Sequence, residues 1–106
     1  MAWVYLIVAG LFEIGWPLGL KMAQTVEGKQ IFGITIAVVS MALSGFFLYT
    51  AQKEIPMGTA YAVWTGIGAA GTFILGIVLY SDPIGTLRIT SVLLILAGVI
   101  GLKLAS

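Results

Sequence analysis

Cysteine and histidine are both absent from this sequence of 106 residues. The chain therefore has no disulfide and no thiol nucleophile, and it lacks the usual protein ligands of zinc and haem. With only four acidic residues, a carboxylate cage for a metal ion is not expected either. No nucleophile–base pair of the kind that enzymes use is recognisable. We predict a protein without metal or cofactor that is not an enzyme.

Charge is scarce as well, since 8% of the residues are charged and 60% are hydrophobic. Soluble proteins have roughly 25% charged residues. A net charge of +1 also excludes a nucleic-acid-binding protein that works through clustered Lys and Arg. The composition predicts an all-α membrane protein whose surroundings are a lipid bilayer.

Four apolar stretches are each long enough to cross a membrane, which takes about 20 residues. Polar turns and Pro56 and Pro83 separate them. No basic residue precedes the first stretch, as it would in a signal peptide, so we interpret it as a retained span. We expect one domain over residues 1–106, with transmembrane helices at about residues 3–22, 31–51, 57–80 and 84–104.

Basic residues are divided almost equally between the two sides of such a bundle. Lys53 and Lys103 would lie on one side, and Lys21, Lys29 and Arg88 on the other. An excess of Lys and Arg on one side normally fixes the orientation. We expect the chain to insert both ways round, which permits an antiparallel homodimer. A single orientation set by the one extra charge is the alternative.

Glu13 lies about 15 Å along a helix from Trp3, near the middle of the bilayer. A carboxylate there costs at least ~2.5–3.5 kcal/mol, which makes it a candidate functional group. In a twofold dimer two Glu13 side chains would face each other, and desolvation and repulsion would disfavour ionising both. Protons and a cation would then compete for the pair, as in a cation/proton antiporter. The alternative is a Glu that only binds a neighbouring helix.

Aromatic and small residues mark the third span. Tyr61 and Trp64 bring hydrogen-bond donors on one helix face, although an interfacial aromatic belt also explains Tyr61. Gly66 and Gly68 lie close together and predict a conformational hinge. Close helix packing through small residues is the alternative.

Three further residues complete the candidates. Ser44 in the second span can donate a hydrogen bond inside the bundle, or to its own helix. Ala97 and Gly101 in the fourth span have the spacing of a helix-packing seam. The fourth span has no polar residue near its centre, so we assign it to dimerisation.

At these residues the chain resembles the small multidrug resistance family, and within it the guanidinium exporters. The resemblance covers essentially the whole chain, most specifically at Phe12-Glu13-Ile14-Gly15-Trp16 with Lys21, at residues 58–68 and at Gly101-Leu102-Lys103. It implies an antiparallel homodimer in the plasma (inner) membrane of a bacterium that exports guanidinium ions in exchange for protons. It also implies that Glu13 binds both substrate and proton, that Trp16, Ser44, Tyr61 and Trp64 orient Glu13 and line its pocket, and that Gly10 leaves room for it.

Trp16 favours guanidinium as the substrate, because the drug-exporting branch has a small residue there. Guanidinium is planar, pairs with a carboxylate through two hydrogen bonds and stacks on rings. Pro17 and a first loop about two residues longer differ from the family pattern. The alternatives are an exporter of larger lipophilic or quaternary ammonium cations, one subunit of a heterodimeric transporter, and a membrane assembly factor that does not transport.

Overall fold

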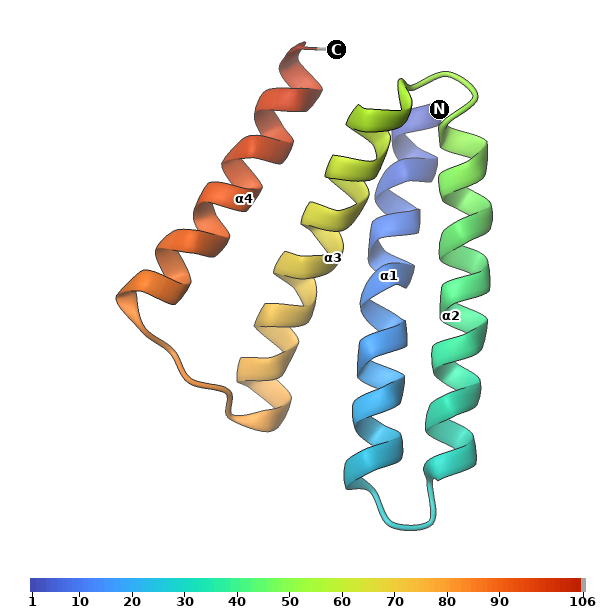
Figure 1. The fold of residues 1–106 in the computed structure, drawn as a ribbon, viewed down its shortest axis with the longest axis vertical. Coiled ribbons are helices and arrows are strands. Elements are labelled where there is room, and N and C mark those ends of the chain that lie inside the picture. The colour runs from blue at the N-terminus through green and yellow to red at the C-terminus, as the bar shows by residue number, and fades with distance from the viewer. Residues whose placement is uncertain (106) are drawn as a thin grey trace.

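The computed structural model describes residues 1–105, which form four helices joined by short turns (Figure 1). Each helix is long and apolar enough to span a membrane, and the described residues contain no strand. The predicted class, an all-α membrane protein with four spans, is confirmed. The helices are α1 (Ala2–Thr25), α2 (Gln30–Ala51), α3 (Met57–Tyr80) and α4 (Thr86–Ala105).

Two helix ends differ from the expected spans by more than one residue. Helix α1 extends to Thr25, so part of the long first loop is helical. Helix α4 begins at Thr86, not at residue 84, and the residue directly before it is Gly85, a weak helix former. Pro17 lies inside α1, which continues through it as one helix.

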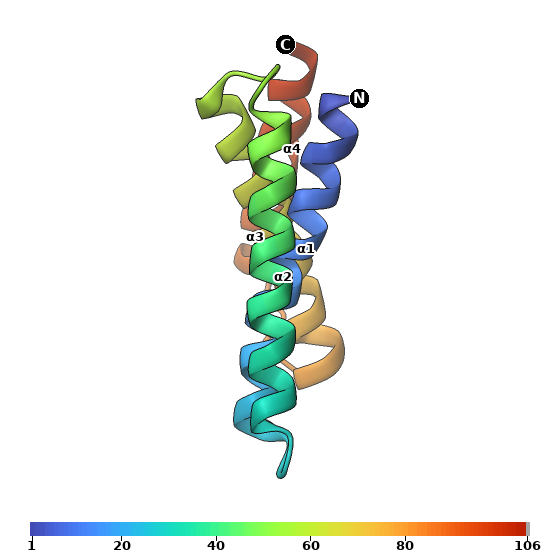
Figure 2. The same ribbon diagram turned by 90° about the vertical axis from the view of Figure 1, so that its right-hand side faces the viewer.

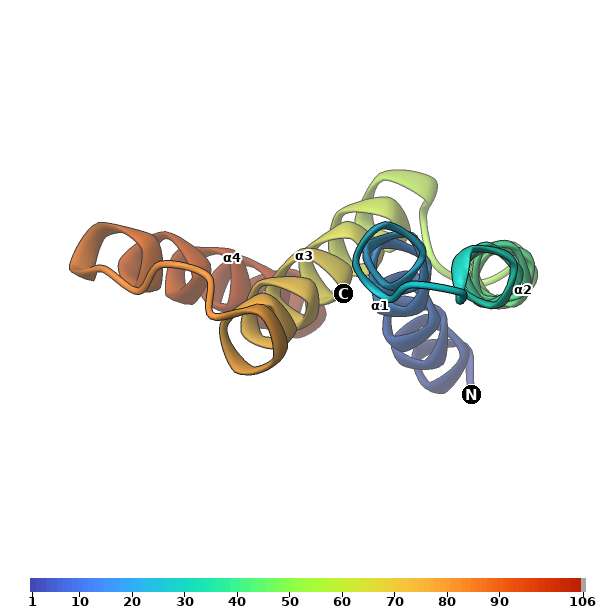
Figure 3. The same ribbon diagram turned by 90° about the horizontal axis from the view of Figure 1, so that it is seen from below.

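The four helices lie side by side in one layer, in the order α2, α1, α3, α4 (Figure 3). The molecule measures 45 × 34 × 16 Å, and its short dimension is little more than the roughly 10–12 Å diameter of one helix. The edge-on view shows how narrow the layer is (Figure 2). Both broad faces of the layer therefore lack a covering second layer within the subunit.

Small residues let α1 and α2 approach closely. A Cβ atom on Gly19 would lie 2.5 Å from the carbonyl oxygen of Gly33, and a Cβ on Gly33 would lie 2.5 Å from that of Gly19. Real side chains cannot occupy such positions, so the two helices are in backbone contact here. Backbone contact of this kind is typical of helix pairs packed inside membranes.

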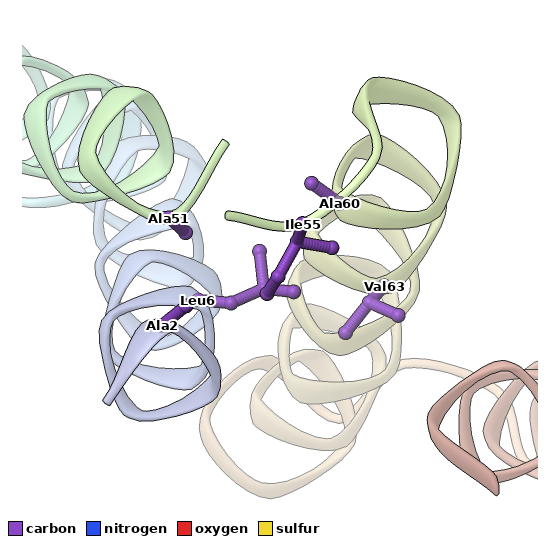
Figure 4. Packing of buried hydrophobic residues seen from close by; sticks show 6 residues of the cluster. All are labelled: Ala2, Leu6, Ala51, Ile55, Ala60 and Val63. Carbon is purple, nitrogen blue, oxygen red and sulfur yellow. The ribbon is translucent and has the colours of Figure 1, made fainter. Parts of the chain in front are cut away.

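The buried core lies at one end of the layer, where the turn between α2 and α3 meets the start of α1. Leu6 and Val63 are almost completely buried, at 0% and 1% exposed. The cluster consists of Ala2, Leu6, Ala51, Ile55, Ala60 and Val63 (Figure 4). This cluster fixes α1 against the first turns of α3.

All five basic side chains lie near helix ends or turns, each over an aromatic ring. Both termini and the α2–α3 turn share one end of the molecule, and the other two turns share the opposite end (Figure 1). Such cation–π contacts suit the membrane interface, where long basic side chains reach toward water. The pairs are Lys21–Tyr80, Lys29–Phe32, Lys53–Tyr49, Arg88–Phe73 and Lys103–Trp3.

Candidate functional site

Glu13 and Trp16 are linked on one face of α1. The Trp16 indole Nε1–H donates a hydrogen bond of 2.6 Å to Glu13 Oε1. Residues three apart face the same side of a helix, so the local sequence alone brings the two together. Both side chains are half-buried. The indole thus holds the carboxylate through one of its two oxygens, Oε1.

Gly68 of α3 provides the space that Glu13 occupies. A Cβ atom at position 68 would lie 2.5 Å from Glu13 Cγ, so any side chain there would displace the carboxylate arm. The atoms nearest to a Cβ on Gly10 would belong to Ile67 of α3, at 2.8 Å. Whether Gly10 also gives Glu13 freedom to move stays a prediction.

Ser44, Trp64 and Tyr61 form a separate group about one helical turn from Glu13. The Trp64 Nε1–H donates to Ser44 Oγ at 2.7 Å, and the Ser44 hydroxyl donates to the Ala9 carbonyl oxygen at 2.7 Å. Ser44 is fully buried, and the Tyr61 ring lies 5.4 Å from the Trp64 ring. This chain of bonds links α1, α2 and α3.

The cavity beside Glu13 has a volume of about 370 Å³. Sequence reasoning identified Glu13 and Trp16 in its wall, and also Gly68, although as a hinge. It did not identify Thr65 and Thr72, whose spacing on α3 would have placed them on the same face. The complete lining is Glu13, Trp16, Pro17, Thr65, Gly68, Ala69, Thr72, Phe73 and Asp82.

The residues predicted to form a hinge lie on α3, and those predicted to pack against a second subunit lie on α4. Helix α3 is continuous through Gly66 and Gly68, and Gly66 makes room for Val99 of α4. Ala97 and Gly101 are both exposed, and a Cβ on Gly101 would meet no atom within 4 Å. Hinge motion at α3 and packing between subunits at α4 stay predictions.

The chemistry available at this site is the binding of a cation. Glu13 Oε1 accepts the indole bond, and no ion pair of Glu13 is present in residues 1–105. Over that same range, no group of three or more His, Cys, Asp and Glu residues could hold a metal ion. A carboxylate beside an indole ring and a cavity suits a small organic cation, through charge and through cation–π attraction.

Comparison with known proteins assigns the family. The sequence model described as "Small Multidrug Resistance protein" matches residues 1–95. A guanidinium exporter of Yersinia pseudotuberculosis is 54% identical over the full length of both chains. One of Escherichia coli K12 is 45% identical over 100% of this chain and 99% of its own, and one of Salmonella typhimurium is 46% identical with the same coverage. With these bacterial relatives and its four spans, the chain belongs to the small multidrug resistance family and is a multi-pass protein of the bacterial plasma (inner) membrane.

Proposed function

We propose that this protein exports guanidinium-type cations in exchange for protons. The observation that carries the proposal is the half-buried Glu13 in the middle of a membrane span, with one carboxylate oxygen bonded by Trp16. Full-length relatives with the name guanidinium exporter support the choice of substrate. Transport, and not an enzymatic reaction, is the activity proposed.

Trp16 prepares Glu13 for a small planar cation. Its N–H fixes the carboxylate plane, and its ring is a flat surface on which a guanidinium plane can stack. Glu13 Oε2 accepts one N–H of the cation, and the cavity of about 370 Å³ provides the volume that the cation needs. The threonine hydroxyls in the wall, at Thr65 and Thr72, can accept its remaining donors.

Competition for Glu13 couples export to protons. A cation and a proton both neutralise the carboxylate, so binding of one disfavours binding of the other. If the loaded site opens alternately to the two sides of the membrane, each cation that leaves is replaced by protons from outside. Gly66 and Gly68 would allow α3 to bend during this exchange.

We further propose that the transporting unit is an antiparallel homodimer with two Glu13 carboxylates in one shared cavity. Three features support it: the single-layer subunit, 16 Å thick, the absence of buried residues on α4, and the nearly equal basic charge at the two ends. A second copy would cover the open face beside Glu13. It would also place Ser44, Tyr61 and Trp64 of both copies around the pair.

The deciding experiment is guanidinium-driven proton flux in liposomes that contain only the purified protein. We expect coupled flux for the wild type and complete loss for Glu13→Gln, which keeps the shape but removes the charge. Glu54→Gln, in the α2–α3 turn, is the matched control and should transport normally. Coupled transport by Glu13→Gln would refute the mechanism.

A binding series and the flux assay together separate the alternatives. Binding measured across a series from guanidinium to bulky aromatic and quaternary ammonium cations should be tightest for guanidinium, and the reverse order would favour a drug exporter. If the purified chain alone carries no substrate, a heterodimer subunit or an assembly factor is favoured.

A further inference from the structure

Two cavities line the groove between α1 and α3, and they share part of their walls. The cavity beside Glu13 is joined by a second one of about 250 Å³, whose wall includes Lys21, Thr72, Gly76, Tyr80 and Asp82. Pro17, Thr72 and Asp82 line both. The groove therefore continues from Glu13 toward the α3–α4 turn.

Two carboxylates lie along one face of α3 in this groove. Glu13 lies against Gly68, and the carboxylate of Asp82 lies against Gly76. Gly68, Thr72 and Gly76 follow each other at four-residue steps, so they share a helix face. Eight residues at 1.5 Å each put the two contact points about 12 Å apart along the helix, with Thr72 midway.

The backbone of the α3–α4 turn brings Asp82 back over α3. Ser81 adopts a left-handed conformation with φ of 55°, and the Asp82 N–H donates to the Gly76 carbonyl oxygen at 3.1 Å. These features depend on backbone atoms and not on the carboxylate. The side chain of Asp82 can therefore change from carboxylate to amide while the turn is kept.

The carboxylate of Asp82 has no basic partner within residues 1–105. Lys21 lines the same cavity, but its ammonium lies over the Tyr80 ring, 5.8 Å from the centroid. The ring face at this cavity thus already attracts a cation. Asp82 supplies an unpaired negative charge beside it.

We propose that Asp82 and Tyr80 form an outer site for the transported cation, on the way between water and Glu13. The proposal rests on the function proposed above and extends it to a second binding station. A guanidinium-type cation pairs with the Asp82 carboxylate, exchanges with Lys21 at the Tyr80 ring and then passes Thr72 to Glu13. An unpaired charge at the mouth of a cavity raises the local concentration of the opposite charge and its rate of association.

The test compares Asp82→Asn with the wild type in guanidinium transport by proteoliposomes at low and high ionic strength. One unit charge at close range in water is worth a change of about fivefold in binding. We expect KM to rise about fivefold at low salt with an unchanged maximal rate, and the difference to shrink at high salt as screening increases. Asp82→Glu should restore a KM close to that of the wild type.

Glu27→Gln is the matched control, because Glu27 is exposed in the α1–α2 turn at the same end of the molecule and lines neither cavity of the groove. Acidic residues contribute little to membrane orientation, so neither variant should alter insertion. An equal rise in KM for Glu27→Gln would overturn the outer site, because the effect would then come from the general surface charge at this end of the molecule. An unchanged KM, or a fall in maximal rate, for Asp82→Asn would also overturn it.

The outer site and the proposed function fail in different ways. If the wild type carries no guanidinium, the proposed function is wrong and the outer site falls with it. If the wild type and Glu27→Gln carry guanidinium and Asp82→Asn has the same KM as they do, only the outer site is wrong.

Discussion

The groove between α1 and α3 and the groove between α3 and α4 are built from the two sides of the same helix. The first contains Glu13, Asp82 and two threonines in its cavities. The second holds a cavity of about 200 Å³ whose lining is entirely apolar: Phe73, Ile74, Ile77, Val78, Ile89, Val92, Leu93 and Leu96. Helix α3 thus has one polar face, which is suited to a cation, and one apolar face, which is suited to lipid or another helix.

Packing also differs between the two grooves. Glycines at positions 10, 68 and 71 leave room for side chains where α1 meets α3, whereas among the described glycines only Gly66 does so where α4 meets α3. Helix α4 packs mainly against α3, reaches α1 at the contact of Lys103 with the Trp3 ring, and has no buried residue. Helices α1 and α3 thus provide most of the wall of the cavity beside Glu13, while none of the residues of α4 is buried in the subunit.

Among variants that keep Glu13, the largest expected effect follows from filling the space at Gly68. In Gly68→Val, the new side chain would collide with Glu13 and displace its carboxylate, and a misplacement of about 1 Å can cost on the order of 100-fold in rate. We expect such a loss in guanidinium flux, with helical content unchanged by circular dichroism. Gly45→Val is the control, because nothing lies within 4 Å of a Cβ there. Equal rates for both variants would contradict the assignment of Gly68 to the site.

Removing the indole donor should have the next largest effect. Trp16→Phe keeps a ring but loses the bond to Glu13, and hydrogen bonds to charged groups contribute about 2 kcal/mol. That corresponds to roughly thirtyfold weaker guanidinium binding, to be measured by titration calorimetry. Trp3→Phe, at the start of the same helix, should bind normally. If both variants bind alike, the Trp16 bond does not orient the carboxylate.

Ser44→Ala should affect stability more than transport. Loss of its hydroxyl leaves the Trp64 N–H without its partner, which costs about 1–3 kcal/mol for a buried donor. We expect the free energy of unfolding, measured in detergent, to fall by that amount. Ser91→Ala in α4 removes an exposed hydroxyl that bonds its own helix at the Leu87 carbonyl, and it should change stability little. A larger loss for Ser91→Ala would reverse the comparison between the two regions.

The smallest expected effect tests α4 as the assembly helix. Gly101→Leu meets no atom within 4 Å of its Cβ in the subunit, so folding of the subunit should be unchanged. If small residues form the dimer seam, overpacking there costs about 1 kcal/mol or more, and cross-linking should show less dimer. Gly45→Leu on α2 provides the comparison. Undiminished cross-linking of Gly101→Leu would remove α4 from the interface.

The sequence predicted the fold class well because bilayer thickness fixes the length of each span. It also predicted the Glu13–Trp16 pair, since a separation of three residues on a helix leaves little freedom. It did not predict that Gly68 lies against Glu13, because contacts between helices depend on their relative rotation and depth. For the same reason it did not predict that Ile67 packs against Gly10.

By itself, the sequence determined that this chain spans a membrane and that one carboxylate, Glu13, is placed in the bilayer at a high cost in free energy. Both conclusions follow from transfer free energies, which depend on residue type and on position along a span. Only the tertiary structure decided which residues surround that carboxylate. The α3–α4 turn folds back through a backbone hydrogen bond from Asp82 to Gly76, and Asp82 and Glu13 line the same cavity. That these two residues share a cavity depends on how α1 and α3 pack against each other, which no local pattern of residues specifies.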